Sequence, residues 1–244
     1  MGNPLRTSQF RVVDTETTGF DPRADAVVEV AWAVVRGDGT KVSDGATLIN
    51  PGRPIPAEAT RVHGIHDRDV ASAPSLGDAI ERHAGLCSPV MTAVIHNAGF
   101  DTAFLNRVPK FRSGNPQVLC SMQLAMNLLP DVGGYSLDHL RGRLGLDNRP
   151  GASAAHRAAG DVATTAALLK LLVDAYLAAG YPDDLATFAQ FSELLRMPFG
   201  RHKGTLLADV PADYIDWLLG REIDAGLRGA LEKARRGALR APPW

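Results

Sequence analysis

Residues 10–19 read FRVVDTETTG, a short run with β-branched residues that stops at an acidic cluster. Such a run predicts a strand, and Asp14 and Glu16, two residues apart, then project from the same face. Two further apolar runs, at 26–35 and 41–49, are separated by a GDG sequence that favours a hairpin. The N-terminal part therefore predicts a meander of strands with two carboxylates at the end of the first strand.

Beyond the meander, strand and helix patterns mix. Residues 90–95 (VMTAVI) predict a buried strand that ends at HNAGFD. We expect helices at 75–86, 100–107, 121–129, 136–144 and 154–179. This succession predicts an α/β fold with a mixed central sheet flanked by helices. The pattern stops at Gly180 and Pro182, so we expect a main domain at 1–180 and a small C-terminal helical module at 181–244.

Composition excludes several classes of protein. The chain of 244 residues has a net charge of -1, so its overall charge does not point to nucleic acid. Two cysteines do not make a disulfide framework. We find neither a secretory signal nor an apolar run of the roughly 18 to 20 residues that span a membrane. By elimination we expect a cytoplasmic protein without a membrane partner.

Acidic residues stand at the ends of several of these elements. Two divalent ions about 3.5–4 Å apart can activate water and offset charge during phosphodiester cleavage, and hard ions prefer carboxylate oxygens. Each acid alone is more often a surface residue or a favourable charge at a helix N-terminus. The set of five residues in this order is more specific. It comprises Asp14, Glu16, Asp101, His156 and Asp161.

Three motifs carry a resemblance to a known family. They are DTETTG at 14–19, HNAGFD at 96–101, and the H-x-x-x-x-D pattern at 156–161. Together they resemble the DEDDh 3′→5′ exonuclease superfamily, of the proofreading-subunit and ribonuclease T type. The later segment MPFGRHKGTLLADVPADYIDWLL resembles the C-terminal part of exonuclease X-like proteins. The resemblance implies a ribonuclease H-like fold for the main domain.

The resemblance also implies roles for single residues. Asp14, Glu16, Asp101 and Asp161 are expected to hold two Mg²⁺ ions, with Mn²⁺ as a substitute, and His156 to act as general base. An imidazole with a pKa near 6.5 suits that task. The backbone at Glu16 and Thr17 is expected to receive the terminal 3′-hydroxyl. Further expected substrate contacts are Glu58, Val62, His63 and Asn97, although Asn97 fits a structural role in its turn better.

The C-terminal segment has two interpretations. Tyr214, Trp217 and Leu218 are spaced i, i+3, i+4, which first of all predicts a helix face packed on a core. A platform for stacking bases is the alternative. The turn at 201–203 (RHK) could contact phosphate or simply be solvated. Helices are expected at 211–221 and 224–238.

We therefore expect a 3′→5′ exonuclease that hydrolyses DNA to nucleoside 5′-monophosphates by a two-metal-ion mechanism. Its partner would be nucleic acid with a free 3′-hydroxyl, with DNA favoured over RNA only by the exonuclease X resemblance. An exonuclease that trims RNA 3′ ends is the nearest alternative. A catalytically idle nucleic-acid-binding module is a further one. The sequence leaves open whether the protein forms a homodimer.

Overall fold

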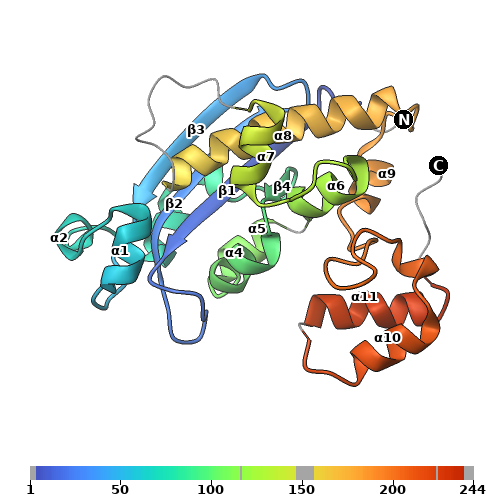
Figure 1. The fold of residues 1–244 in the computed structure, drawn as a ribbon. Helices are drawn as coiled ribbons and strands as arrows, with labels where there is room; N and C mark the ends of the chain where they lie inside the picture. The colour runs from blue at the N-terminus through green and yellow to red at the C-terminus, as the bar shows by residue number, and fades with distance from the viewer. Residues whose placement is uncertain (1–3, 116, 147–156, 224, 239–244) are drawn as a thin grey trace.

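The fold is built around one mixed sheet (Figure 1). The computed structural model describes residues 4–115, 117–146, 157–223 and 225–238. The sheet has the order β3-β2-β1-β4-β5. Its strands are β1 (Gln9–Thr17), β2 (Val27–Arg36), β3 (Lys41–Leu48), β4 (Thr92–Ile95) and β5 (Val118–Cys120). The first three pair antiparallel, whereas β4 lies parallel to both β1 and β5. This confirms the predicted mixed sheet, with β5 as an additional short strand.

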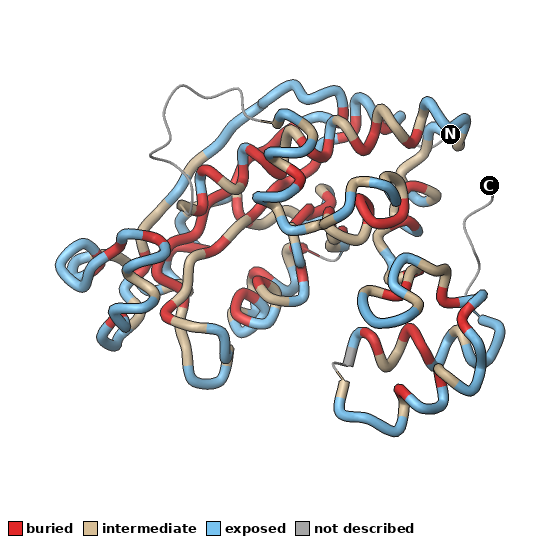
Figure 2. Tube along the Cα trace, in the orientation of Figure 1, coloured by how far each residue is buried: buried red, intermediate tan, exposed pale blue. Residues whose placement is uncertain are grey.

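Helices cover both faces of the sheet. One face packs on α8 (Ala158–Ala178), α6 (Ser121–Leu128) and α7 (Leu137–Leu144). The other face packs on α3 (Leu76–Arg82), α4 (Ala98–Leu105) and α5 (Pro109–Gly114). Figure 2 shows the buried positions concentrated along the sheet and along α8. Two apolar cores, one on each side of β1, therefore hold this strand in place.

The long helix α8 begins later than predicted. Residues 154–156 lie outside the described part of the chain, and Arg157 has an extended backbone, with φ -129° and ψ 134°. Ala158 is the first residue of the helix. Its N–H donates to the carboxylate of Glu29 at 3.1 Å, which satisfies one of the donors that a helix start leaves free. Asp161 consequently lies in the first turn of α8.

Two short helices follow the proline-rich segment after β3. They are α1 (Ala57–His63) and α2 (Asp67–Val70), and neither was predicted as a helix. Gly64 ends α1 with φ +72°, a left-handed conformation that glycine adopts without a steric penalty. Ile55, Ile65 and Val70 pack on Val28 and attach this segment to the sheet.

The C-terminal part has a hydrophobic core of its own. It contains α9 (Leu185–Gln190), a 3₁₀ turn η3 (Leu207–Asp209), α10 (Ala212–Leu219) and α11 (Ala225–Arg235). Phe188 and Phe191 still pack in the main core, whereas Met197, Leu207 and other residues up to Leu231 form a separate cluster. The chain thus passes from the main core to the C-terminal core after Phe191. The predicted domain boundary lies earlier in the chain, at the break in the pattern at residue 180. Figure 1 shows α10 and α11 as a small body beside the sheet domain.

Among the described residues, no helix combines the length and the apolar character needed to cross a bilayer.

Candidate active site

The site forms at the C-terminal end of β1. Side chains alternate between the two faces of a strand, so Asp14 and Glu16 share the face of Phe10 and Val12, which packs on α8. Thr15 points to the opposite face, towards α4. The C-terminal end of β1 therefore lies between two helices: α8 packs on one face of the strand and α4 on the other.

Three carboxylates meet on the α8 side. One ligand oxygen each from Asp14, Glu16 and Asp161 can be chosen so that all three lie within 4.8 Å of one another. All three residues are half-buried. This is the one group within the described residues whose spacing suits a metal ion, and oxygen ligands of this kind suit Mg²⁺ or Mn²⁺. The structure thus brings together three of the four residues expected to bind metal.

The fourth acid, Asp101, approaches from the other face. It lies in the first turn of α4 and is buried. Its Oδ1 accepts hydrogen bonds from the backbone N–H of Thr15 at 3.0 Å and from the Thr15 hydroxyl at 2.7 Å. Asp101 is close enough for its charge to raise the pKa of Asp14. It therefore borders the three carboxylates and also fixes the backbone between Asp14 and Glu16.

Burial and mutual repulsion make these carboxylates hard to ionise. Burial, followed by the charges of Asp101, Asp161 and Glu16, raises the pKa of Asp14 well above its ordinary value. Burial and then Asp161 raise the pKa of Glu16 to about 8. Burial raises the pKa of Asp101 to about 7, although the hydrogen bonds from Thr15 act in the opposite direction. Like charges held this close need a cation nearby before all of them can ionise.

An ion pair with a buried carboxylate, which the sequence analysis missed, supports the start of α8. Glu29, on β2 opposite Glu16, accepts hydrogen bonds from Arg157 Nε at 3.0 Å and Arg157 Nη2 at 2.6 Å. The same carboxylate accepts the N–H of Ala158. The Glu29 side chain is only 4% exposed. The signal in the sequence was one acid inside the otherwise apolar run AVVEVAWAVV, because an acid is rarely buried without a partner.

The expected substrate contacts lie around this end of the sheet. The Thr17 hydroxyl donates to the carbonyl of Gly19 at 2.7 Å. His63 is buried and accepts the N–H of Ile65 at its Nδ1. Burial lowers the pKa of His63, which favours a neutral ring. Val62 is 57% exposed, and the exposed Glu58 pairs with Arg61 at 3.4 Å.

The turn between β4 and α4 is unusual. Asn97 has φ +55°, the one described residue other than glycine with a positive φ. The ring of the preceding His96 bonds to Ser121 through Nδ1 and to the Tyr135 carbonyl through Nε2, both at 2.9 Å. Asn97 itself is exposed. Asparagine tolerates this left-handed conformation better than most residues. The predicted base, His156, lies outside the described residues.

An aromatic residue beside the site was also missed. Phe20, directly after the first motif, is 89% exposed, and its ring lies 6.2 Å from that of Phe100 between centroids. Its position directly after the first motif makes it a neighbour of the site, although single exposed apolar side chains are common on protein surfaces.

Comparisons with known proteins agree with this geometry. A family model described as an exonuclease matches residues 12–169. A second model, described as a putative quorum-sensing-regulated virulence factor, matches residues 188–231. The chain is similar to exodeoxyribonuclease 10 of Escherichia coli, with 31% identity over 220 residues, 86% of this chain and 90% of the relative. It is 41% identical over 175 residues to a DNA polymerase III subunit epsilon-like protein of Rhodobacter capsulatus, but spans only 24% of that protein's length.

Solved structures give the same picture. Exonuclease X in complex with 5′ overhanging duplex DNA is similar at a TM-score of 0.57 and 31% identity, covering 75% of this chain and 99% of that one. Exonuclease I of E. coli in complex with a dT13 oligonucleotide has a TM-score of 0.59 at 18% identity, covering 71% of this chain and 43% of its own. The second likeness concerns the fold alone.

Proposed function

The chain belongs to the exonuclease family, and from this membership we propose that it hydrolyses DNA from the 3′ end, releasing nucleoside 5′-monophosphates. The observation that carries the proposal is the group of three carboxylates at the end of β1. DNA is proposed as substrate because the relatives include an exodeoxyribonuclease and an exonuclease solved with duplex DNA.

The donor set fits divalent cations. Asp14, Glu16 and Asp161 offer oxygen ligands within 4.8 Å, and Asp101 borders them. We propose that these four residues hold two Mg²⁺ ions, for which Mn²⁺ can substitute. Bound ions of this kind activate water and offset the charge that develops on the attacking and leaving oxygens. The raised pKa values of the carboxylates are the physical sign of a site in which charge compensation is incomplete.

Other residues of the chain are proposed to transfer the proton and to bind the substrate. His156 takes the proton of the attacking water as general base, a role for which its ordinary pKa is suited. Its neighbour in sequence, Arg157, is anchored by Glu29. The hydrogen bonds that Thr15 donates to Asp101 fix the backbone next to Glu16 and Thr17. This stretch of backbone is proposed to receive the terminal 3′-hydroxyl. Glu58, Val62 and His63 of α1 are proposed to contact the terminal nucleotide.

The decisive experiment follows release of mononucleotides from 3′-labelled and 5′-labelled oligonucleotides with Mg²⁺ present. We expect loss of label from the 3′ end first, on DNA more than on RNA of the same sequence, and no reaction in excess chelator. Asp14→Asn should abolish turnover. Asp44→Asn is the matched control, because Asp44 is an exposed strand residue paired with Lys41. Full activity in chelator would refute the metal site, and faster hydrolysis of RNA would change the proposed substrate.

A further inference from the structure

The C-terminal module presents a row of aromatic and basic side chains. Tyr214 and Trp217 on α10 stack with their ring centroids 5.5 Å apart and their planes 29° from parallel. Arg201 lies over the Tyr214 ring at 5.3 Å, and Arg221 over the Trp217 ring at 4.9 Å. We name these four residues the Arg-Tyr-Trp-Arg ladder.

Trp217 and the two arginines lie on the surface, whereas Tyr214 also packs against the module's core. The expected core-facing stripe on α10 is only partly correct, because Leu218 is 3% exposed whereas Trp217 is 51% exposed. Ile215 and Leu218 fill the core instead. Tyr214 and Trp217 are spaced i, i+3 on α10, and Arg221 follows just after the helix ends at Leu219. Trp217 lies between the Tyr214 ring and Arg221 and is the more exposed of the two rings.

The turn that contains Arg201 approaches Tyr214 closely. Gly200 has φ +74°, and a Cβ at this position would lie 2.7 Å from the Tyr214 hydroxyl. Only glycine therefore permits both this backbone conformation and this close approach. His202 packs its ring edge-on against Tyr214, with centroids 4.7 Å apart. The turn at 201–203 therefore packs on Tyr214, and this packing holds Arg201 against the ring.

Charge decides the kind of ligand. Arg201, Lys203 and Arg221 are exposed. Of the acids on α10, Asp216 pairs with Arg235 at 2.8 Å and Asp213 accepts the N–H of Tyr214. Stacked rings flanked by cations suit unpaired bases joined by phosphates, since every base offers a flat face. Bases in a duplex already stack on one another and cannot use such rings.

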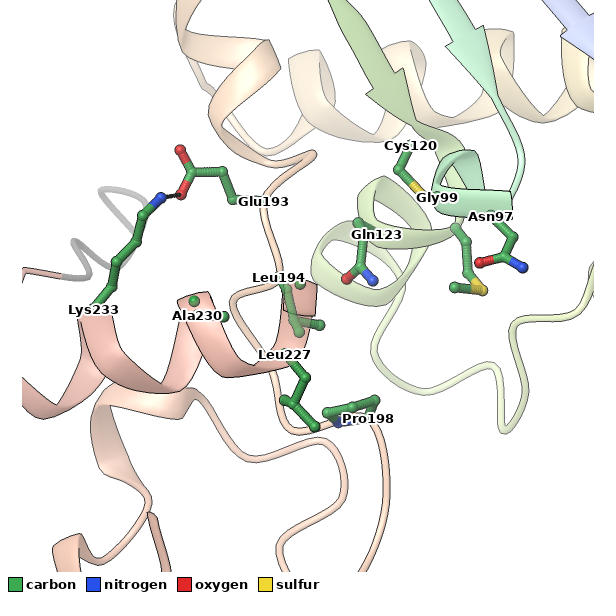
Figure 3. A pocket seen from close by; sticks show the side chains of 13 residues that line it. Asn97, Gly99, Cys120, Gln123, Glu193, Leu194, Pro198, Leu227, Ala230 and Lys233 are labelled. Atoms are coloured by element: carbon green, nitrogen blue, oxygen red, sulfur yellow. Dashed lines mark hydrogen bonds and ion pairs between the residues drawn. The ribbon is translucent and has the colours of Figure 1, made fainter. Parts of the chain in front are cut away.

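The module lies next to the active-site side of the sheet domain. A cleft of about 590 Å³ separates α11 from the turn that leads to Asp101. Figure 3 shows Asn97 and Gly99 on one wall and Leu227 and Ala230 on the other, with the Glu193–Lys233 pair at one end. The cleft begins at the turn that leads to Asp101 and ends at α11, and the ladder lies beyond it on the same module.

We propose that the Arg-Tyr-Trp-Arg ladder binds a single-stranded segment of the nucleic acid substrate, away from the 3′ end that is cleaved. This site rests on the proposed function, because it holds the same strand at a second place. It would act on affinity and not on the chemical step.

The test measures binding of 5′-fluorescein dT30 by anisotropy to the full chain carrying Asp14→Asn, with Mg²⁺ present. Adding Trp217→Leu should weaken binding by about 5- to 150-fold, the range for loss of one stacked base. Trp217→Phe, which keeps a ring, should restore most of the affinity. Arg221→Ala should lower the slope of log affinity against log salt by about 0.7, the value for one lost phosphate contact on a single strand. Arg36→Ala, an exposed arginine at the far end of β1 and β2, is the control.

Steady-state kinetics without the Asp14 substitution separate this proposal from the proposed function. Trp217→Leu should raise the KM for dT30 at unchanged kcat and leave the hydrolysis of dT3 unaffected. Binding of dT30 within two-fold of the parent in both Trp217→Leu and Arg221→Ala would overturn the ladder. An equal loss on dT3 and dT30 would show a general structural effect and overturn it as well. Failure of every chain to hydrolyse any oligonucleotide would refute the proposed function, while the anisotropy result still decides the ladder.

Discussion

The carboxylates at the end of β1 make the metal-free protein sensitive to pH. Glu16 shows this best, because burial and the charge of Asp161 raise its pKa from 4.5 to about 8. An acid whose pKa is raised by folding contributes stability that is fully present below its unfolded pKa. That contribution is lost as the pH rises through its folded pKa. We therefore expect the metal-free protein to lose stability between about pH 4.5 and pH 8.

The size of the effect follows from the pKa. At about 1.36 kcal/mol for each pKa unit, a rise from 4.5 to about 8 corresponds to at most about 5 kcal/mol. Neighbouring acids share the same repulsion, so replacing one of them recovers only part, about 1–3 kcal/mol. Glu16→Gln keeps the shape of the side chain and removes its charge. In a chain of this size, 1 kcal/mol shifts Tm by about 2–4 °C, so we expect a gain of about 2–12 °C at pH 8 without metal.

The assay is thermal unfolding in chelator at pH 5, 6, 7 and 8, followed by calorimetry or circular dichroism. The gain from Glu16→Gln should be small at pH 5, just above the unfolded pKa of Glu16, and grow towards pH 8. Saturating Mg²⁺ should stabilise the wild type more than the variant. Glu58→Gln, the same change on the exposed face of α1, should leave Tm unchanged. A gain independent of pH, or a variant less stable than the wild type at pH 8, would refute the reasoning.

Four further outcomes are expected. Arg157→Ala should cost about 3–5 kcal/mol in urea unfolding, because it strands a Glu29 carboxylate that is only 4% exposed. Glu29→Gln should cost less, about 1–2 kcal/mol, because Arg157 is 43% exposed and can turn to water. His156→Ala should lower turnover by about 10²- to 10⁴-fold but retain Mn²⁺ binding, measured by calorimetry. Loss of Mn²⁺ binding would show that His156 is a metal ligand. An oligonucleotide with a 3′-phosphate should resist degradation, and equal rates for both ends would exclude the proposed substrate pose.

Much of the sheet and part of the site could be predicted from local patterns. Alternation along β1 is sufficient to place Asp14 and Glu16 on one face, and apolar periodicity is sufficient to locate most of the helices. The short strand β5 and the helices α1 and α2 were not predicted, because three to seven residues are too few to show a clear hydrophobic period. Their positions depend on packing against the sheet, which no local pattern records.

The tertiary contacts of the site could not be read from the sequence. The bond between Asp101 and Thr15 joins residues 86 positions apart, and that between Arg157 and Glu29 joins residues 128 apart. The motif resemblance implied that Asp101 binds metal, but not that it also holds the backbone of β1. On α10, the i, i+3, i+4 spacing placed Trp217 and Leu218 on one face, whereas the buried face contains Ile215 and Leu218 and leaves Trp217 exposed.

The ion pair of Glu29 and Arg157 gives a final reason to expect cations at this site. Arg157 lowers the pKa of Glu16, so its charge does reach the carboxylates. Both of its hydrogen-bonded nitrogens, however, face Glu29, whose own charge raises the pKa of Glu16. The positive charge of Arg157 and the negative charge of Glu29 therefore nearly cancel in their effect on the three carboxylates. The ion pair leaves the repulsion between Asp14 and Glu16 uncompensated. Cations bound from solution would relieve this repulsion, so the way β1 and α8 pack leads us to expect metal affinity at this site.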